Sequence, residues 1–263
     1  MSDPRPLHRL FGLSWIDFFQ DTTISVETEI DLSIKQQFLD LVLIRKGREP
    51  IPRRLPDGFE ELAAHNLVTF KSHQETLDGW ALCELIGHYV NYRKQSSPSL
   101  HDLLSEIDFR LFAVCARFPY SLSQQVALTS VQEGVYETRL VTMSTRIIVL
   151  HQLPCDEQNA MLHLFSAREE LLRYGREHYR PHSVETSTLL YKLLKVYKED
   201  LNMSEKLREF VRQTLDEMVQ DMSPEERLKG LTADEIAKAL PPEIREELAR
   251  QLKANGSAPK SPG

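Results

Sequence analysis

Residues 65–94 read HNLVTFKSHQETLDGWALCELIGHYVNYRK. Within this stretch, residues 66–71 form a short apolar run, as expected of a buried strand. Residues 77–94 carry apolar side chains at helical spacing and end on basic residues, which favour a helix C-terminus. The stretch therefore predicts a strand that is followed closely by a long helix.

The segments on either side predict further strands. Residues 23–30, TISVETEI, alternate in polarity and are rich in β-branched side chains, and residues 35–45, KQQFLDLVLIR, form a second apolar strand. The stretch 46–58 is rich in Pro, Gly and charge and reads as a loop. The remaining predicted elements are helices at 6–20 and 155–175 and strands at 109–117, 134–140 and 144–151.

After Pro181 the pattern is helical to about residue 253. We therefore expect an α/β domain over residues 1–175, a helical extension over 176–253 and a disordered tail over 254–263. Ser223, Thr232 and Pro241 are nine residues apart and each begins a segment that suits the start of a short helix.

The bulk composition is that of a soluble globular protein. Apolar residues make up 41% and charged residues 27% of the 263, and the net charge is -7. The three cysteines lack CxxC spacing, no signal peptide is visible and no apolar run is long enough to span a membrane, so we expect a cytoplasmic protein with no membrane partner. Any contact with nucleic acid must come from a local basic patch.

One acid stands out because it lies inside an apolar strand. Asp40 interrupts the run FLDLVLI, where a buried carboxylate is costly unless it is paired or binds a metal ion. Lys71 ends the next predicted strand. Metal-dependent hydrolysis of a phosphodiester needs carboxylates to hold the cation, and a lysine can orient water or stabilise the developing charge.

The run 65–94 together with Asp40 resembles the core of the PD-(D/E)XK nuclease superfamily. Within it, the chain is similar to the bacterial recombination-promoting nucleases and their transposase-like relatives. The matching features are the second-strand acid Asp40, Lys71 followed by Ser72, and a helix with a Tyr near its end, at Tyr89 or Tyr92. The resemblance implies an α/β fold with a restriction-endonuclease-like core, a mixed central sheet flanked by helices. It also implies an endonuclease that cuts DNA with Mg²⁺ or Mn²⁺.

The chain departs from that pattern at Thr69, where the family has Glu. A neutral hydroxyl replaces a carboxylate poorly as a ligand of Mg²⁺, so another acid must complete the site or catalysis is lost. The candidates for that acid are Glu29, Glu75 and Glu84. From the resemblance we expect Asp40, Glu29 and Lys71 to be catalytic, with metal ligands from Asp40, Glu29, Glu84 and the carbonyl of Phe70.

The loop that follows the Asp40 strand is basic. It contains Arg45, Lys46, Arg48, Arg53 and Arg54 against a single acid, Glu49. We expect these side chains to neutralise DNA phosphates near the site. A solvated turn would have the same composition.

The alternative is a catalytically inactive nuclease-fold protein that binds nucleic acid or assembles with partners. Its helical C-terminal region would then support a homo-oligomer. The nuclease interpretation requires the Asp40 and Lys71 side chains to lie on the same side of the sheet, and a second carboxylate to lie close to Asp40.

Overall fold

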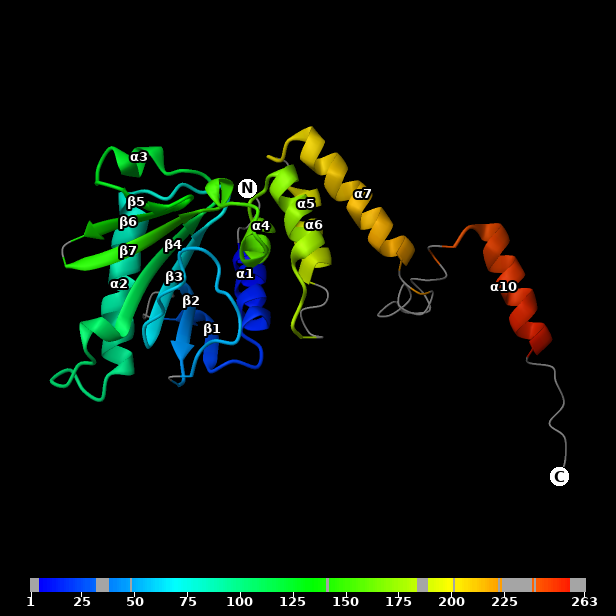
Figure 1. Cartoon of the computed structure of the whole chain (residues 1–263). Helices are drawn as coiled ribbons and strands as arrows, with labels where there is room; N and C mark the ends of the chain where they lie inside the picture. Colours follow the sequence, from blue (N-terminus) through cyan, green and yellow to red (C-terminus); the bar gives the residue numbers. More distant parts are fainter. Residues whose placement is uncertain are drawn as a thin grey trace, which may run out of the picture. The chain divides into compact units, whose positions relative to one another are not determined.

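The computed structural model describes residues 5–255, apart from 32–37, 48, 141, 184–188, 201, 222, 224–237 and 239. Its centre is a seven-stranded mixed sheet with the order β1-β2-β3-β4-β7-β6-β5 (Figure 1). The strands are β1 (Ile24–Asp31), β2 (Phe38–Arg45), β3 (His65–Lys71), β4 (Phe109–Cys115), β5 (Thr129–Gln132), β6 (Val135–Leu140) and β7 (Met143–Val149).

Parallel and antiparallel pairs divide the sheet into three parts. β1, β2 and β3 form an antiparallel meander, while β3, β4 and β7 are parallel to one another. β6 and β5 then continue antiparallel from β7. A parallel pair needs a crossover connection, which α2 (Gly79–Ser96) provides between β3 and β4.

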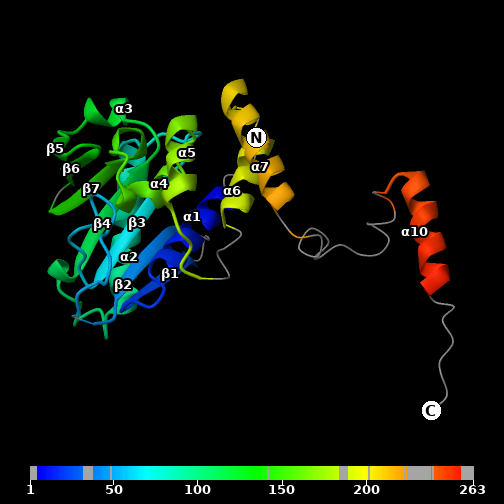
Figure 2. The ribbon, with the colours of Figure 1, turned by 45° about the vertical axis from the view of Figure 1, so that its right-hand side comes forward.

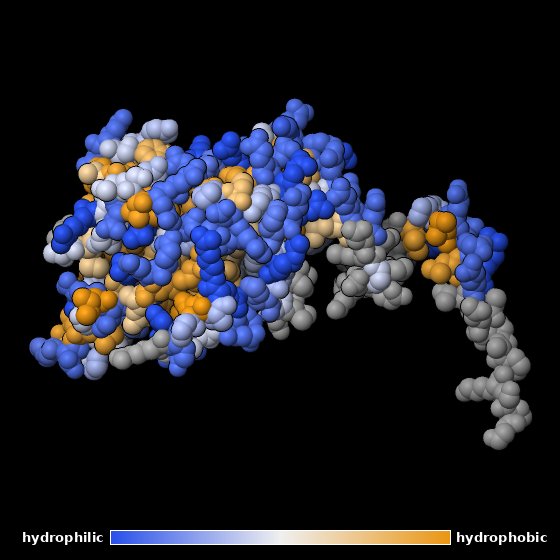
Figure 3. Space-filling view, viewed as in Figure 1, coloured by the Kyte–Doolittle hydropathy of each residue, from blue (hydrophilic) through white to orange (hydrophobic). Residues whose placement is uncertain are grey.

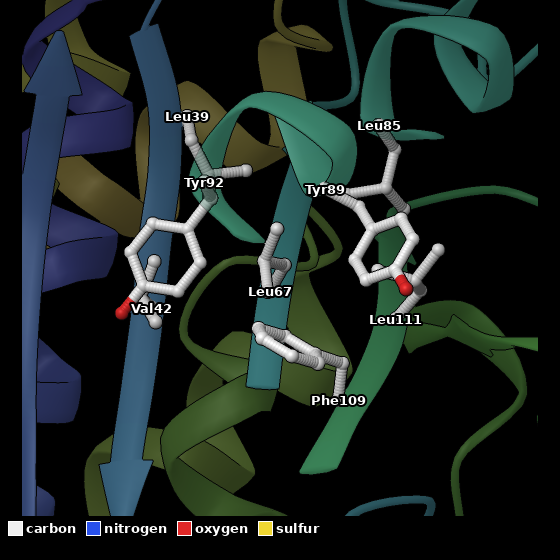
Figure 4. Close-up of a cluster of buried hydrophobic side chains, with 8 residues drawn as sticks. All are labelled: Leu39, Val42, Leu67, Leu85, Tyr89, Tyr92, Phe109 and Leu111. Carbon is white, nitrogen blue, oxygen red and sulfur yellow. The ribbon is translucent and has the colours of Figure 1, made fainter. Parts of the chain in front are cut away.

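One face of the sheet is covered by α2. The cluster in Figure 4 joins three strands to this helix, with Leu67 of β3 and Leu111 of β4 packed against Leu85 and Tyr89. The helix begins at Asp78, whose carboxylate accepts a hydrogen bond of 2.9 Å from the amide of Ala81. The predicted strand-to-helix order is therefore confirmed.

The other face is covered by α1 (Arg5–Phe18). Phe11 is fully buried and stacks on Phe70 of β3 with ring centroids 4.4 Å apart. Trp15 is also fully buried and packs on Phe59, from the loop before β3. Two views of the ribbon show α1 beside β1 and β2 (Figures 1 and 2). The mixed α/β class with flanking helices is thus confirmed.

The remaining helices follow β7, except for a short turn of helix after β4. They are α3 (Tyr120–Ser123), α4 (Ala160–His163), α5 (Glu169–His178), α6 (Leu189–Glu199), α7 (Glu205–Asp221) and α10 (Pro242–Asn255). The prediction of one helix over 155–175 is wrong, because α4 ends at His163 and Ala167, which has a left-handed backbone with φ 53°, separates it from α5. The short exposed strand β5 was not predicted.

The chain forms two compact units, Met1–Leu215 and Asp216–Gly263. The first unit runs past residue 175 because α6 and α7 bury apolar side chains against it. Leu193 and Val211 are fully buried, and Arg173 of α5 lies over the ring of Phe210 at 4.8 Å. These two helices therefore share the core of the α/β part.

In the second unit the structure describes α10, which begins at Pro242 as the Pro-Pro pair predicts. The segments that begin at Ser223 and Thr232, and the tail beyond Asn255, lie largely or wholly outside the described residues. Apolar surface is visible on α10 in Figure 3, where Ile244 is 53% exposed. In the described parts of the chain, no helix is both long and apolar enough to cross a bilayer.

Candidate functional site

Asp40 lies where β2 and β3 separate. The last described pair of these strands joins Leu41 to Val68. Beyond it, the Asp40 carboxylate takes the place of a strand partner. Its Oδ2 atom accepts hydrogen bonds from the Phe70 amide at 2.7 Å and from the Thr69 hydroxyl at 3.0 Å. The acid is thus held by the strand that it faces.

Thr69, the departure from the family pattern, has a structural partner. Its side chain is buried and its hydroxyl donates to Asp40. Phe70 contributes its amide to the same carboxylate, whereas the family resemblance assigned it a carbonyl ligand. Both residues therefore orient Asp40 by hydrogen bonds.

Asp40 and Lys71 lie on the same side of the sheet. The paired register of β2 and β3 ends at Leu41 and Val68, and extending it by one residue sets Asp40 against Thr69, in agreement with the hydrogen bond between their side chains. Opposite residues of an antiparallel pair share a face. Lys71 is two residues further and shares that face by the strand period. Independently, both charges act on the pKa of His88 in α2, which burial and Lys71 lower and Asp40 raises.

A second carboxylate, Glu75, approaches Asp40 through a histidine of α1. His8 Nδ1 lies 2.6 Å from Asp40 Oδ1, and His8 Nε2 lies 3.0 Å from Glu75 Oε2. Burial alone lowers the pKa of His8, but its hydrogen bonds to the two acids raise it to about 10. At neutral pH an imidazolium therefore stands between two carboxylates.

Glu75 is fixed by the tight turn that follows β3. Its Oε2 atom accepts hydrogen bonds from the amide of Ser72 at 3.1 Å and from the Ser72 hydroxyl at 2.9 Å. Burial raises the pKa of Glu75, and the bonds to His8 and Ser72 outweigh it, so the pKa falls to about 2. Lys71 Nζ lies 4.0 Å from Glu75 Oε1. The group thus contains two anions and two cations.

The four charged side chains of this group, Asp40, Glu75, His8 and Lys71, are between 16% and 26% exposed. They are therefore partly open to solvent. We call these four residues the carboxylate–imidazole cluster.

Two other predicted ligands, Glu84 and Glu29, lie on α2 and β1. Glu84 is exposed on α2, where its charge raises the pKa of His88. Glu29 lies in β1 between two described pairs, Thr28 with Leu41 and Ile30 with Leu39, and its side chain lies outside the described part of the structure.

The basic loop does not adjoin Asp40. Asp40 lies near the start of β2 and the loop leaves the other end of this strand, five residues on, which corresponds to roughly 17 Å at 3.4 Å per residue. The contact of these basic side chains with DNA phosphates stays a prediction.

Two of the arginines in that loop have structural partners. Arg45 donates to the carbonyls of Gly47 and Glu49, and Arg53 donates to the carbonyls of Phe18 and Gln20. Lys46 and Arg54 are exposed, and Arg48 lies outside the described residues. Arg53 and Arg54 also line two surface pockets of about 550 and 470 Å³. Among the loop residues that the structure describes, Lys46 and Arg54 are exposed basic side chains that could meet an anion.

His8 was missed by sequence reasoning, and Glu75 was considered but not selected. The signal for Glu75 is the Ser-x-x-Glu spacing of residues 72–75, in which a carboxylate accepts from an amide three residues earlier. The sequence around His8 carries no comparable signal, because its partners are 32 and 67 residues away.

The donor chemistry of Asp40 and Glu75 fits a hard divalent cation. Mg²⁺ in proteins commonly takes one or two carboxylates and completes its shell with water and substrate phosphates. Among the residues that the structure describes, no group of three or more His, Cys, Asp or Glu side chains is arranged to hold a metal ion. The carboxylate–imidazole cluster therefore offers two acids, Asp40 and Glu75, that both contact the His8 ring.

Comparison with models of protein families, with curated proteins and with solved structures found no match.

Proposed function

We propose that the chain is a DNA endonuclease of the PD-(D/E)XK type, in which a divalent cation binds between Asp40 and Glu75. The mixed sheet, with an acid on its second strand and a lysine closing the third, supports a restriction-endonuclease-like core. The observation that carries the proposal is the convergence of two carboxylates on one imidazolium, with Lys71 beside them.

Each residue of the chain would have a distinct role. Asp40 and Glu75 would hold Mg²⁺ or Mn²⁺ in the position that the His8 imidazolium takes up. The cation would supply positive charge against the phosphate. Lys71 would orient the attacking water or stabilise charge on the phosphate oxygens. The Phe70 amide and Thr69 hydroxyl keep Asp40 in place by their hydrogen bonds.

A second candidate is a nuclease-fold protein without catalysis, which binds nucleic acid or assembles with partners. This candidate is favoured by the hydrogen bonds that the carboxylate oxygens already accept. Both oxygens of Asp40, and Oε2 of Glu75, already accept hydrogen bonds from His8, Thr69, Phe70 or Ser72. A cation must displace His8 to bind, which costs the free energy of those two charged hydrogen bonds.

A plasmid-nicking assay with Mg²⁺ or Mn²⁺ separates the two candidates. We expect the wild type to nick supercoiled DNA, and Asp40→Ala and Glu75→Gln each to lower the rate at least 100-fold, because each removes an essential carboxylate. Glu84→Gln, at an exposed acid of α2, is the matched control and should keep the wild-type rate.

Two results would contradict the nuclease proposal. One is equal nicking by the wild type and the Asp40 variant, which would point to a contaminating enzyme. The other is no nicking by the wild type together with DNA binding that is indifferent to Mn²⁺, which would favour the non-catalytic candidate.

A further inference from the structure

The turn that carries Glu75 is held from the end of α6, more than 120 residues away in the sequence. Asp200 follows α6 directly and is 4% exposed. Its Oδ2 atom accepts a hydrogen bond of 2.7 Å from His73 Nε2 and one of 2.6 Å from Gln74 Nε2. A single buried carboxylate thus binds both residues that separate Ser72 from Glu75.

Two further contacts hold His73 itself. Arg117 donates to the carbonyl of His73 at 2.8 Å, and the His73 ring meets the edge of Tyr197 at 6.2 Å. The second ring nitrogen of His73, Nδ1, is buried and has no hydrogen-bond partner among the residues that the structure describes. The orientation of the His73 ring therefore depends on the bond to Asp200.

Asp200 is itself anchored in the core. Tyr197, one helical turn earlier, is fully buried and donates to the carbonyl of Leu164 at 2.9 Å. The amide of Asn202 donates to the other oxygen of Asp200, Oδ1, at 2.9 Å. Burial raises the pKa of Asp200, and its hydrogen bonds outweigh that effect and lower it, so the group is an anion at neutral pH. A fixed, charged acceptor is therefore presented to the turn.

We propose that Asp200 is a positioning residue, whose carboxylate holds His73 and Gln74 and so fixes Glu75 in the cluster with His8 and Asp40. A role of Asp200 in catalysis rests on the proposed function, whereas its hydrogen bonds to His73 and Gln74 do not. It makes the region around α6 part of the candidate active site. The helical segment that follows residue 176 thus contributes more than a stabilising appendage.

The test compares Asp200→Ala and Asp200→Asn with two controls. Glu199→Ala removes the neighbouring exposed acid of the same helix. Leu193→Ala removes a fully buried side chain from the same helix and reports general destabilisation. Hydrogen exchange of the peptide that covers residues 72–78, read by mass spectrometry, measures the turn, and Mn²⁺ titration measures the site.

We expect exchange in residues 72–78 to rise about tenfold in Asp200→Ala and less in Asp200→Asn, which keeps an acceptor oxygen. Mn²⁺ affinity should fall in the same order. Exchange in β6 and β7 should not change, and Glu199→Ala should match the wild type.

The proposal is overturned if Asp200→Ala loosens residues 72–78 no more than Leu193→Ala does at the same loss of Tm. It is also overturned if the wild type binds Mn²⁺ and the turn loosens in Asp200→Ala while the Mn²⁺ affinity of that variant equals that of the wild type. If the turn loosens and the wild type binds no Mn²⁺ and nicks no DNA, the positioning contact stands and the nuclease proposal fails.

Discussion

Replacing His8 with glutamine should remove a large part of the pH dependence of stability at alkaline pH. The folded chain holds the His8 proton up to a pKa of about 10, whereas the ordinary value is 6.5. When folding raises the pKa of a group, the stabilisation is complete below the pKa of the unfolded chain. It is lost as the pH rises through the pKa of the folded chain. The wild type should therefore weaken steadily between these two values.

The size of the effect follows from proton linkage. One proton released on unfolding changes the free energy of unfolding by about 1.4 kcal/mol per pH unit, so the His8 contribution falls by about 2–3 kcal/mol from pH 7 to pH 9. Little of this is lost to solvent screening, because the His8 side chain is 18% exposed.

Urea unfolding at pH 7, 8 and 9, at constant ionic strength, measures this difference. His101→Gln is the matched control, since His101 is exposed in the loop after α2. The reasoning is refuted if the unfolding free energies of wild type and His8→Gln run parallel over this range, because His8 would then carry no proton in the fold.

Three further changes test the packing and the backbone around the sheet. Asp17 is fully buried and accepts hydrogen bonds from the Tyr179 hydroxyl and the His182 amide; Asp17→Ala should cost about 3 kcal/mol or more in urea unfolding, and Asp21→Asn, at an exposed site, should stay within about 0.5 kcal/mol. Gly134 has φ 72° and an added Cβ would lie 2.7 Å from the backbone of Gln152, so Gly134→Ala should lower stability by about 1–3 kcal/mol. In contrast, Gly87 lies in α2 with open space at its Cβ position, and Gly87→Ala should raise Tm through a gain of about 0.5–1 kcal/mol.

The strands of the α/β core could be predicted because their patterns are local. The alternation in residues 23–30 and the apolar runs of β2 and β3 placed three strands within a few residues of their observed bounds. Asp40 could be singled out for the same reason, since one acid in an apolar run is visible without knowledge of its partners.

Elements whose limits depend on tertiary contacts could not be predicted. The break between α4 and α5 lies at Ala167, a residue that gives no sign of a left-handed backbone. Likewise α6 and α7 are amphipathic. That pattern is expected both of helices in an independent extension and of helices that pack on the α/β core. Burial of residues such as Leu193 decides between these alternatives.

The candidate site was predictable in half. Asp40 and Lys71 were selected from their places on the predicted strands. The separation of Asp40 from the basic loop could be estimated only once the bounds and direction of β2 were known. His8 lies far before and Asp200 far after the site residues in the sequence. Their contacts with the site could not be predicted from sequence spacing.

The claim on which the account depends is that Asp40 and Glu75 share one cation. Anomalous diffraction from crystals soaked in Mn²⁺ tests it directly. We expect one strong peak with an oxygen of each acid about 2 Å away and the His8 ring displaced from between them. An unbroken contact of His8 with both acids at saturating Mn²⁺, with no peak beside either carboxylate, would contradict it.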